Sequence, residues 1–262
     1  MKEDPMYLER FRLDGQTAFI TGGGRGIGLA TAEALAEAGA RVIISDMNPD
    51  VLEAGRRELT GKGYTVDAVV LDVTDSKAVA AAARSANQRY QAVDILVANA
   101  GIAWPDTGGE EMSDEVWLRV VDVDLNGAYW SCREFARPML ERGRGSIVTL
   151  GSMSGLISNK PQRQAHYNAA KAAVHHMTRS LAGEWAERGV RVNCVAPTYV
   201  DTVMSRDGFT DDKLMPVWMD MTPMRRVARA DEIAAPILFL ASSASSAMTG
   251  SVVVVDCGYT IW

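Results

Sequence analysis

Short, continuous runs of apolar residues recur along this chain, and the longer stretches between them repeat apolar residues at helical spacing. We predict β-strands at seven of the runs, namely 17–21, 41–45, 65–71, 94–99, 146–150, 190–195 and 251–256. Strands that are apolar on both faces are typical of a parallel sheet covered on both sides. The predicted fold class is therefore α/β: a Rossmann-like, doubly wound, seven-stranded parallel sheet with helices on both faces.

Nothing in the sequence divides the chain into domains. It contains no internal repeat, low-complexity segment or linker rich in Pro, Gly and Ser, so we expect one domain over residues 1–262. The interval 198–229 is too long for a simple connection between a strand and the next helix. Because insertions of this size often cover a site, we predict a substrate lid at about 198–229.

Composition and charge exclude several classes of protein. A chain with 47% hydrophobic and 23% charged residues is an ordinary globular protein, and its net charge of −6, without a basic cluster, argues against a nucleic-acid partner. No apolar run approaches the roughly 18 residues of a membrane span, and the opening MKEDPMYLER lacks a signal-peptide pattern. We therefore expect a cytoplasmic protein with no membrane partner.

The three cysteines indicate neither disulfides nor a metal. Cys132, Cys194 and Cys257 lie far apart, without metal-ligand spacing, and are interpreted as small buried side chains. We expect no metal site built on them.

A glycine-rich loop follows the first predicted strand. The segment TGGGRGIG (21–28) runs directly into a helical pattern. Gly22, Gly26 and Gly28 are spaced so that the chain turns tightly, a pyrophosphate can approach the backbone and the helix packs on the sheet. A glycine cluster alone can be only a turn, but the order strand, turn, helix favours a dinucleotide site.

The end of the second predicted strand carries Asp46. A carboxylate there can accept hydrogen bonds from both ribose hydroxyls of the adenosine and would repel a 2′-phosphate, which predicts NAD rather than NADP. Asp46 could instead cap the next helix, but Asn48 before Pro49 already supplies a good cap. Arg25 could still meet a 2′-phosphate.

Candidate catalytic residues follow the later strands. In YNAAK (167–171) the i, i+4 spacing places Tyr167 and Lys171 on one helical face, where the cation would lower the pKa of the phenol. The spacing alone also fits plain packing. Ser152 and Ser154, however, follow the strand at 146–150, at the edge where a hydroxyl can hydrogen-bond a reacting oxygen.

Taken together, TGGGRGIG, Asp72, ANAG (98–101), the serine, YNAAK and the later AP-x-x-x-x-T resemble the short-chain dehydrogenase/reductase family over nearly the whole chain. The resemblance implies that Tyr167 is the proton donor and acceptor, that Ser152 orients the substrate oxygen, and that Lys171 holds the nicotinamide ribose and lowers the pKa of Tyr167. Ser152 is preferred to Ser154 because Thr149 to Ser152 matches the family's strand-end pattern.

The resemblance also implies a cofactor site, including a wall around the nicotinamide carboxamide. The predicted cofactor-binding residues are Gly22, Arg25, Gly26, Ile27, Gly28, Asp46, Met47, Asp72, Val73, Asn99, Ala100, Gly101, Tyr167, Lys171, Pro197, Val200 and Thr202.

One catalytic position departs from the family pattern. Asp124 stands where the fourth catalytic residue is normally asparagine, with Asn126 two residues further on. The family role is attributed to a backbone carbonyl that holds a water leading to the lysine, so Asp124 remains a catalytic candidate. A buried carboxylate near Lys171 could also change the pH profile.

Five segments resemble bacterial polyol dehydrogenases of the galactitol dehydrogenase type, namely FRLDG (11–15), LGSMSG (150–155), NKPQ (159–162), WMDMTPM (218–224) and GYTIW (258–262). The resemblance implies a homotetramer that oxidises a secondary hydroxyl of a sugar alcohol or diol to the ketone with NAD. The predicted substrate-binding residues are Ser152, Ser154, Asn159, Tyr167 and Tyr199, with Gln162 and His166 as further polar candidates.

Two rival functions remain. A reductase of 3-oxoacyl thioesters would use the same residues with NADPH, although Asp46 argues against that cofactor. A Rossmann scaffold can also serve a non-catalytic dinucleotide-sensing protein, since fold does not fix function. The intact serine, tyrosine and lysine set argues against that role.

Overall fold

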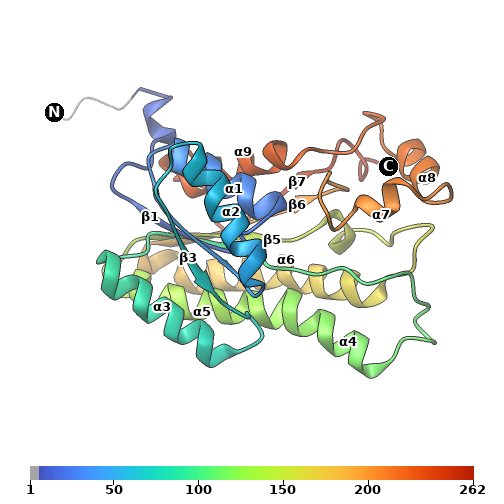
Figure 1. Cartoon of the computed structure of the whole chain (residues 1–262), viewed down its shortest axis with the longest axis horizontal. Helices are drawn as coiled ribbons and strands as arrows, with labels where there is room; N and C mark the ends of the chain where they lie inside the picture. Colours follow the sequence, from blue (N-terminus) through green and yellow to red (C-terminus); the bar gives the residue numbers. More distant parts are fainter. Residues whose placement is uncertain (1–5) are drawn as a thin grey trace.

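The computed structural model describes residues 6–262, so residues 1–5 of the opening segment judged for a signal pattern lie outside the described part. Within it, seven strands form one sheet in the order β3-β2-β1-β4-β5-β6-β7, and every neighbouring pair is parallel. The predicted doubly wound α/β fold is confirmed (Figure 1). The strands are β1 (Thr17–Thr21), β2 (Arg41–Asp46), β3 (Val66–Val70), β4 (Ile95–Ala98), β5 (Gly145–Leu150), β6 (Val190–Pro197) and β7 (Val252–Val255).

Helices cover both faces of the sheet (Figure 1). One layer contains α1 (Gly26–Glu37), α2 (Pro49–Gly61) and α9 (Ala230–Ala241), and the other contains α3 (Ser76–Tyr90), α5 (Ala128–Arg142) and α6 (Ala165–Trp185). The short α4 (Asp114–Val121) packs against α6 and leads into α5 through a π-helical turn, η2 (Asp122–Gly127). This π turn interrupts the region 113–142, which otherwise is helical as the sequence pattern indicates.

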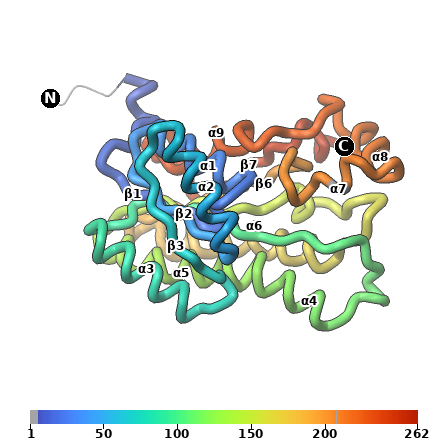
Figure 2. The backbone as a smooth tube through the Cα atoms, in the orientation of Figure 1, coloured from blue at the N-terminus to red at the C-terminus, as the bar shows by residue number. Residues whose placement is uncertain are grey.

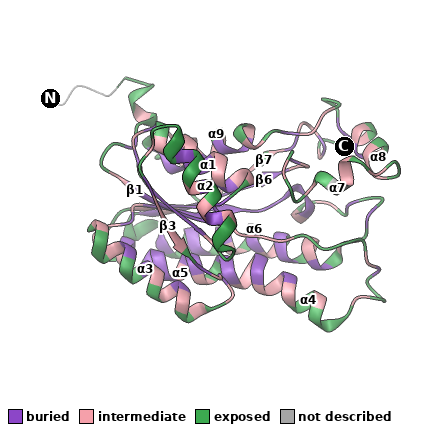
Figure 3. Ribbon diagram, in the orientation of Figure 1, coloured by how far each residue is buried: buried purple, intermediate pink, exposed green. Residues whose placement is uncertain are grey.

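The core consists of two apolar clusters, one on each side of the sheet. Successive residues of a strand point to opposite faces, so Ile20 belongs to one cluster and its neighbour Phe19 to the other. Figure 3 shows the strands and the inward helix faces as buried, with exposed residues on the outer helix surfaces. The apolar runs in the sequence therefore reflect strands that are covered on both sides.

The predicted lid, 198–229, emerges beside the carboxyl end of the sheet (Figure 2). It contains α7 (Arg206–Phe209) and α8 (Met215–Met221). Its two ends are joined, because Val200 pairs with Ala228 in an isolated bridge, and the Ala228 N–H donates to the Tyr199 carbonyl at 3.0 Å. The segment is thus a loop whose two ends are held on the body of the fold.

Candidate active site

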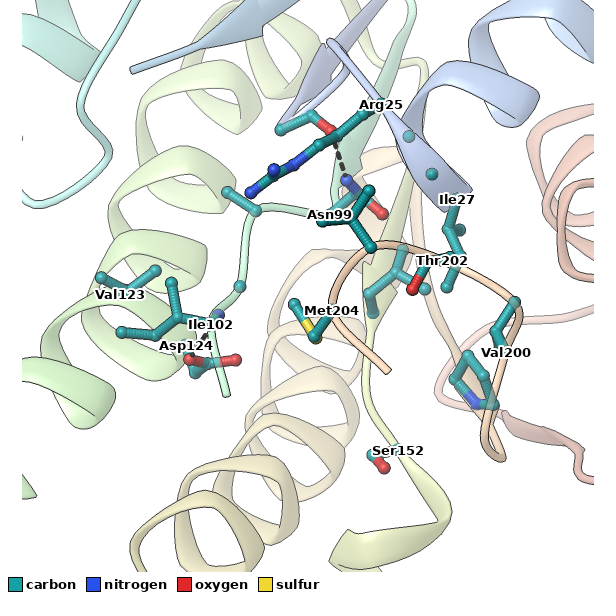
Figure 4. Close-up of a pocket in the computed structure, with 18 of the residues that line it drawn as sticks. Arg25, Ile27, Asn99, Ile102, Val123, Asp124, Ser152, Val200, Thr202 and Met204 are labelled. Atoms are coloured by element: carbon teal, nitrogen blue, oxygen red, sulfur yellow. Dashed lines mark hydrogen bonds between the residues drawn. The ribbon is translucent and has the colours of Figure 1, made fainter. Parts of the chain in front are cut away.

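One pocket lies at the carboxyl ends of the strands, close to the point between β1 and β4 where the strand order reverses. All of the predicted cofactor-binding residues line it, together with Ser152 and Asp124. Figure 4 shows Arg25 and Asn99 toward one part of the pocket and Asp124 and Ser152 toward another. The structure therefore brings the separate sequence motifs into one site.

The glycine loop is held tightly against the end of β4. Gly22 and Gly26 have φ values of +63° and +56°, in the left-handed region that favours glycine. A Cβ at Gly28 would collide with the Gly22 carbonyl oxygen and the Asn99 side chain. The Asn99 amide donates to the carbonyls of Thr21 and Gly22 at 2.9 and 3.0 Å. Glycine at position 28 thus allows the first turn of α1 to approach the loop.

Asp46 and Arg25 lie at the adenosine end of the predicted cofactor site. The Asp46 carboxylate accepts a hydrogen bond from the Asn48 N–H at 3.0 Å. The Asn48 side chain caps α2 by accepting from the N–H groups of Asp50 and Val51, so Asp46 is not the helix cap. Among the side chains that the structure describes, neither Asp46 nor Arg25 has an ion-pair partner. Both charges face solvent and the pocket.

Tyr167 and Lys171 lie at the other end, near the start of α6. The Lys171 ammonium is 5.5 Å from the centre of the Tyr167 ring, and the lysine is only 3% exposed. It donates a hydrogen bond to the Leu150 carbonyl at 3.1 Å and forms an ion pair with Asp124 at 2.8 Å. The i, i+4 pair predicted from YNAAK is therefore a half-buried phenol that lines the pocket, beside a buried, already paired ammonium.

This pairing changes the expected acid-base behaviour of the phenol. Burial raises the pKa of Tyr167, Lys171 and a hydrogen bond with Ser152 lower it, and Asp124 raises it, with a net increase. Lys171 therefore lowers the pKa of the phenol, as expected, but burial outweighs this effect. For Lys171 itself, burial has the largest single effect and lowers the pKa, but the charge of Asp124, the Tyr167 phenol and the contact with the Asp124 carboxylate together raise the pKa above its ordinary value.

The π turn η2 places Asp124 beside the lysine. One carboxylate oxygen contacts Lys171, and the other accepts a hydrogen bond from the Ile102 N–H at 3.1 Å (Figure 4). A Cβ at Gly101 would lie 2.8 Å from the first oxygen, so glycine leaves room for the ion pair. The side chain of Asp124, rather than only its backbone carbonyl, is therefore in direct contact with Lys171.

The two candidate serines occupy different positions. Ser152 lines the pocket, and its hydroxyl accepts a hydrogen bond from the Ser154 N–H at 3.1 Å. Ser154 is buried behind it and accepts a hydrogen bond from the Gln164 amide at 3.3 Å. The geometry favours Ser152 as the serine that faces a substrate oxygen.

His175 supports this serine and was not identified from the sequence. Its Nε2 accepts a hydrogen bond from the Ser152 N–H at 3.4 Å. A Cβ at Gly151 or Gly155 would collide with or crowd the imidazole, so both glycines make room for it. Burial, followed by the charges of Arg179 and Lys171, lowers the pKa of His175 to about 4, and it is neutral at pH 7. The sequence places His175 one helical turn after Lys171, and this spacing could have indicated that the two side chains lie on the same face of the helix.

The other substrate candidates form a packed cluster beside the pocket. Tyr199 stacks on Trp218 with a centroid separation of 3.8 Å, and its hydroxyl accepts from the amides of Asn159 and Gln162 at 3.1 and 2.8 Å. None of these side chains lines the pocket, and neither does the fully buried His166. Their predicted contact with substrate stays a prediction.

The described residues add two negative observations. In the part of the chain whose side chains the structure describes, no group of three or more His, Cys, Asp or Glu side chains is arranged to hold a metal ion. Cys132 and Cys194 are buried free thiols as expected, whereas Cys257 is a free thiol that is only half-buried. No helix in that range is long and apolar enough to cross a membrane.

Residues 22–260 match the sequence model of a protein family described as enoyl-(acyl carrier protein) reductase. The chain is also 48% identical over 257 residues to galactitol 2-dehydrogenase (L-tagatose-forming) of Cereibacter sphaeroides, covering 98% of this chain and 99% of that protein. The chain belongs to the short-chain dehydrogenase/reductase family.

Solved structures agree with membership of the short-chain dehydrogenase/reductase family. The crystal structure of gox2181 is 50% identical, covers 98% of this chain and 100% of its own, and superposes with a TM-score of 0.97. A gluconate 5-dehydrogenase from Burkholderia cenocepacia J2315, solved in complex with NADP and tartrate, is 36% identical, with a TM-score of 0.92 and coverage of 97% and 99%.

Family membership establishes the class of chemistry. The chain is an oxidoreductase that acts on alcohol CH–OH groups with a nicotinamide dinucleotide, and its relatives support a sugar alcohol as the substrate class. The residues at the pocket fit such a cofactor, because Gly28 keeps the start of α1 close to the loop and Asp46 remains free of other charges. The choice between NAD and NADP is a separate question.

Proposed function

We propose that this short-chain dehydrogenase/reductase oxidises a secondary hydroxyl of a sugar alcohol or diol to the ketone, with NAD as the hydride acceptor. The observation that carries the proposal is that Tyr167, Lys171 and Ser152 share one pocket with the unpaired carboxylate of Asp46. The galactitol 2-dehydrogenase of Cereibacter sphaeroides, matched over nearly its whole length, supports the substrate class.

In this proposal Ser152 orients the carbinol oxygen, and the Tyr167 phenolate removes the hydroxyl proton. When bound, the oxidised nicotinamide accepts the hydride from the carbinol carbon. The O–H electron pair stays on the oxygen and becomes the second bond of the carbonyl, while the C–H electron pair leaves the carbon with the hydrogen as hydride. The proton on Tyr167 then passes to solvent.

Lys171 has a donor left for the cofactor. An ammonium has three N–H groups. One donates to the Leu150 carbonyl, and the Asp124 carboxylate lies 2.8 Å away as an ion-pair partner, so at least one N–H remains. A remaining N–H is assigned to the nicotinamide ribose, as the family resemblance implies. Lys171 would therefore remain charged and would keep the nicotinamide ribose positioned beside the Tyr167 phenol.

The cofactor preference rests on Asp46. A carboxylate can accept from the ribose 2′- and 3′-hydroxyls, whereas the negative charge opposes a 2′-phosphate. The gluconate 5-dehydrogenase complex contains NADP, so a relative with this fold binds the phosphorylated cofactor. Arg25, exposed beside Asp46 at the mouth of the pocket, is the one group in our predicted cofactor site that would favour the phosphate.

The remaining expectations are part of the same proposal. Val203 and Met204 of the lid line the pocket and are 54% and 52% exposed, so lid closure over a substrate would bury them. Ser154, Asn159 and Tyr199 are proposed to contact or shape the substrate region from the adjoining cluster. A homotetramer and a cytoplasmic location also remain proposals.

The test is a substrate panel with both cofactors. Purified protein is incubated with NAD⁺ or NADP⁺ and sugar alcohols, short diols or 3-hydroxyacyl thioesters, and reduced nicotinamide is followed by absorbance. Turnover of polyols with NAD⁺ is expected. In Asp46→Ala, the NAD/NADP ratio of kcat/KM should fall roughly 10- to 100-fold, because charged hydrogen bonds contribute about 1.5–3 kcal/mol. An unchanged ratio would contradict the ribose contact.

One observation favours a second candidate. The matching family model carries the description of a reductase of acyl carrier protein substrates, and a 3-oxoacyl thioester reductase would use the same Tyr167, Lys171 and Ser152. Activity on thioesters with NADPH, and none on polyols, would replace the first proposal with this one.

A further inference from the structure

Asp124 and Lys171 form an ion pair that is almost completely removed from water. The side chain of Asp124 is 0% exposed and that of Lys171 is 4% exposed, and their charged atoms are 2.8 Å apart. The Ile102 N–H and the Leu150 carbonyl provide one further hydrogen bond to each partner. Because both groups are anchored in this way, their charges stay fixed beside the phenol.

The pair changes the charge that the phenol experiences. With a neutral amide at position 124, the nearby charge would be that of the ammonium alone, +1. With the carboxylate, the two charges sum to zero. An isolated cation near a phenol favours the phenolate, whereas a paired cation favours it much less. The phenolate therefore loses part of the electrostatic support that Lys171 alone would give, because Asp124 raises the pKa of Tyr167 while Lys171 lowers it.

The other groups around the phenol do not replace that support. The titratable or polar groups facing Tyr167 from the surrounding elements are Lys171 on α6, Asp124 on η2, Ser152 after β5 and Tyr199 after β6. Ser152 donates only a neutral hydrogen bond, and the Tyr199 phenol opposes a second phenolate nearby. Among these groups, Lys171 and Asp124 are the only full charges.

Neighbouring titratable groups near the ion pair are uncharged at neutral pH. Burial lowers the pKa of both His166 and His175, and burial raises the pKa of the Cys194 thiol. They therefore add no net charge in the working range of pH.

We propose that Asp124 is a positioning residue that, by pairing the charge of Lys171, keeps Tyr167 protonated to higher pH and so moves alcohol oxidation toward alkaline conditions. Oxidation needs the phenolate as proton acceptor, whereas ketone reduction needs the phenol as proton donor. The carboxylate thus favours the protonation state required for reduction at neutral pH. This inference rests on the proposed role of Tyr167.

The test compares Asp124→Asn with the wild-type enzyme. Asparagine keeps an oxygen for the Ile102 N–H and removes the charge. The rising limb of kcat/KM for polyol oxidation against pH, at saturating NAD⁺, is expected to move to lower pH by about one unit or more. An unmoved limb would overturn the proposal, whatever happens to the plateau rate.

Asp122→Asn is the matched control. Asp122 lies on the same π turn, but it is half-buried and accepts a hydrogen bond from the Asn126 amide at 2.7 Å, and Lys171 is not its partner. Its pH profile should coincide with that of the wild-type enzyme. An equal shift in this variant would show that general loss of negative charge, rather than the ion pair, is responsible.

A second measurement does not need a folded Asp124 variant or any turnover. Tyrosinate absorbance of the wild-type protein is titrated to about pH 10, the ordinary tyrosine pKa, and compared with Tyr167→Phe. Identical curves are expected, since Tyr167 should remain protonated. An extra tyrosinate in the wild-type protein over this range would overturn the proposal. If no alcohol is oxidised at any pH, the proposed function fails, and this titration still tests the acid-base argument.

Discussion

The charged side chains at the two ends of the pocket differ in burial and in ionic pairing. At the proposed adenosine end, Asp46 and Arg25 have no ionic partner among the described side chains and line the pocket. At the catalytic end, Lys171 is buried and is paired with Asp124. An open charge selects a ligand by attracting or repelling it. A charge that is paired inside the protein acts instead on its neighbours, here the phenol of Tyr167.

An aspartate is therefore proposed to have a different role at each end of the pocket: Asp46 selects the cofactor, and Asp124 affects the pH dependence of the reaction. Removal of Asp46 should change which cofactor binds, while the fold and the chemical step remain. Removal of the charge at position 124 should change the pH dependence of the chemical step. The following predictions test whether the two ends separate in this way.

The largest effect is expected from Tyr167→Phe at the catalytic end. Loss of the phenol removes the proton acceptor, so kcat should fall by about 10²-fold or more. The ring is retained, so the dissociation constant for NAD⁺, measured by calorimetry, should change little. Retention of more than about a tenth of wild-type kcat would contradict the assignment.

Gly28→Ala should mainly reduce the affinity for the cofactor, whereas Tyr167→Phe should mainly reduce kcat. The added Cβ would collide with the Gly22 carbonyl and the Asn99 side chain, so the loop must shift and dinucleotide affinity should fall at least about tenfold. The matched control is Gly183→Ala on α6, where no atom lies within 4 Å of the added Cβ. That variant should bind normally and gain about 0.5–1 kcal/mol in stability. Equal affinities for the two variants would refute the close-approach argument.

The lowered pKa of His175 is expected to have a smaller effect, on the pH dependence of the protein's stability. Its pKa is 6.5 as a free side chain and about 4 in the fold. A base with a lowered pKa contributes stability above pH 6.5, and this contribution is lost as the pH falls toward 4. The free energy of unfolding, measured from urea curves, should therefore fall over this window, with about 3 kcal/mol as the upper bound of the contribution from His175.

The variant His175→Gln should show a weaker fall between these pH values. His175→Gln should not abolish the loss of stability at low pH, because burial also lowers the pKa of His166. The exposed neighbour His176 provides the control, and His176→Gln should retain the wild-type pH dependence. A wild-type slope in His175→Gln would show that the buried imidazole does not control acid stability.

Arg25→Ala should have the smallest effect. The exposed guanidinium is expected to favour NADP(H) only a few-fold, and salt should screen the effect. Kinetics with both cofactors at low and high ionic strength measure it. A large, salt-independent loss of NAD⁺ turnover would mean that the open end contributes more than charge selection.

Much of the fold and of the cofactor end could be predicted from the sequence because the signals there are local. The run TAFIT followed by TGGGRGIG specifies a strand, a turn and a helix within a dozen residues. Position after a strand also placed Asn99 and Ser152 at the correct edge of the sheet. These features depend on chain order and on parallel pairing alone.

The catalytic end depends on distances between segments that are remote in sequence. The contact of Asp124 with Lys171 requires the π turn and a glycine at position 101, and the packing of His175 requires Gly151 and Gly155. Burial then outweighs the lowering of the Tyr167 pKa by Lys171. Local spacing identifies such residues, but it does not determine desolvation or which partner a charge finds.

The bridge between Val200 and Ala228 has a consequence for how substrate range could evolve. It closes residues 201–227 into a loop whose ends are fixed by backbone pairing. Lengthening a flexible loop with fixed ends is inexpensive, with about 0.6 kcal/mol for each doubling of its length. Insertions and deletions in 201–227 could therefore reshape the region above the pocket while the sheet, the glycine loop and the catalytic residues keep their positions.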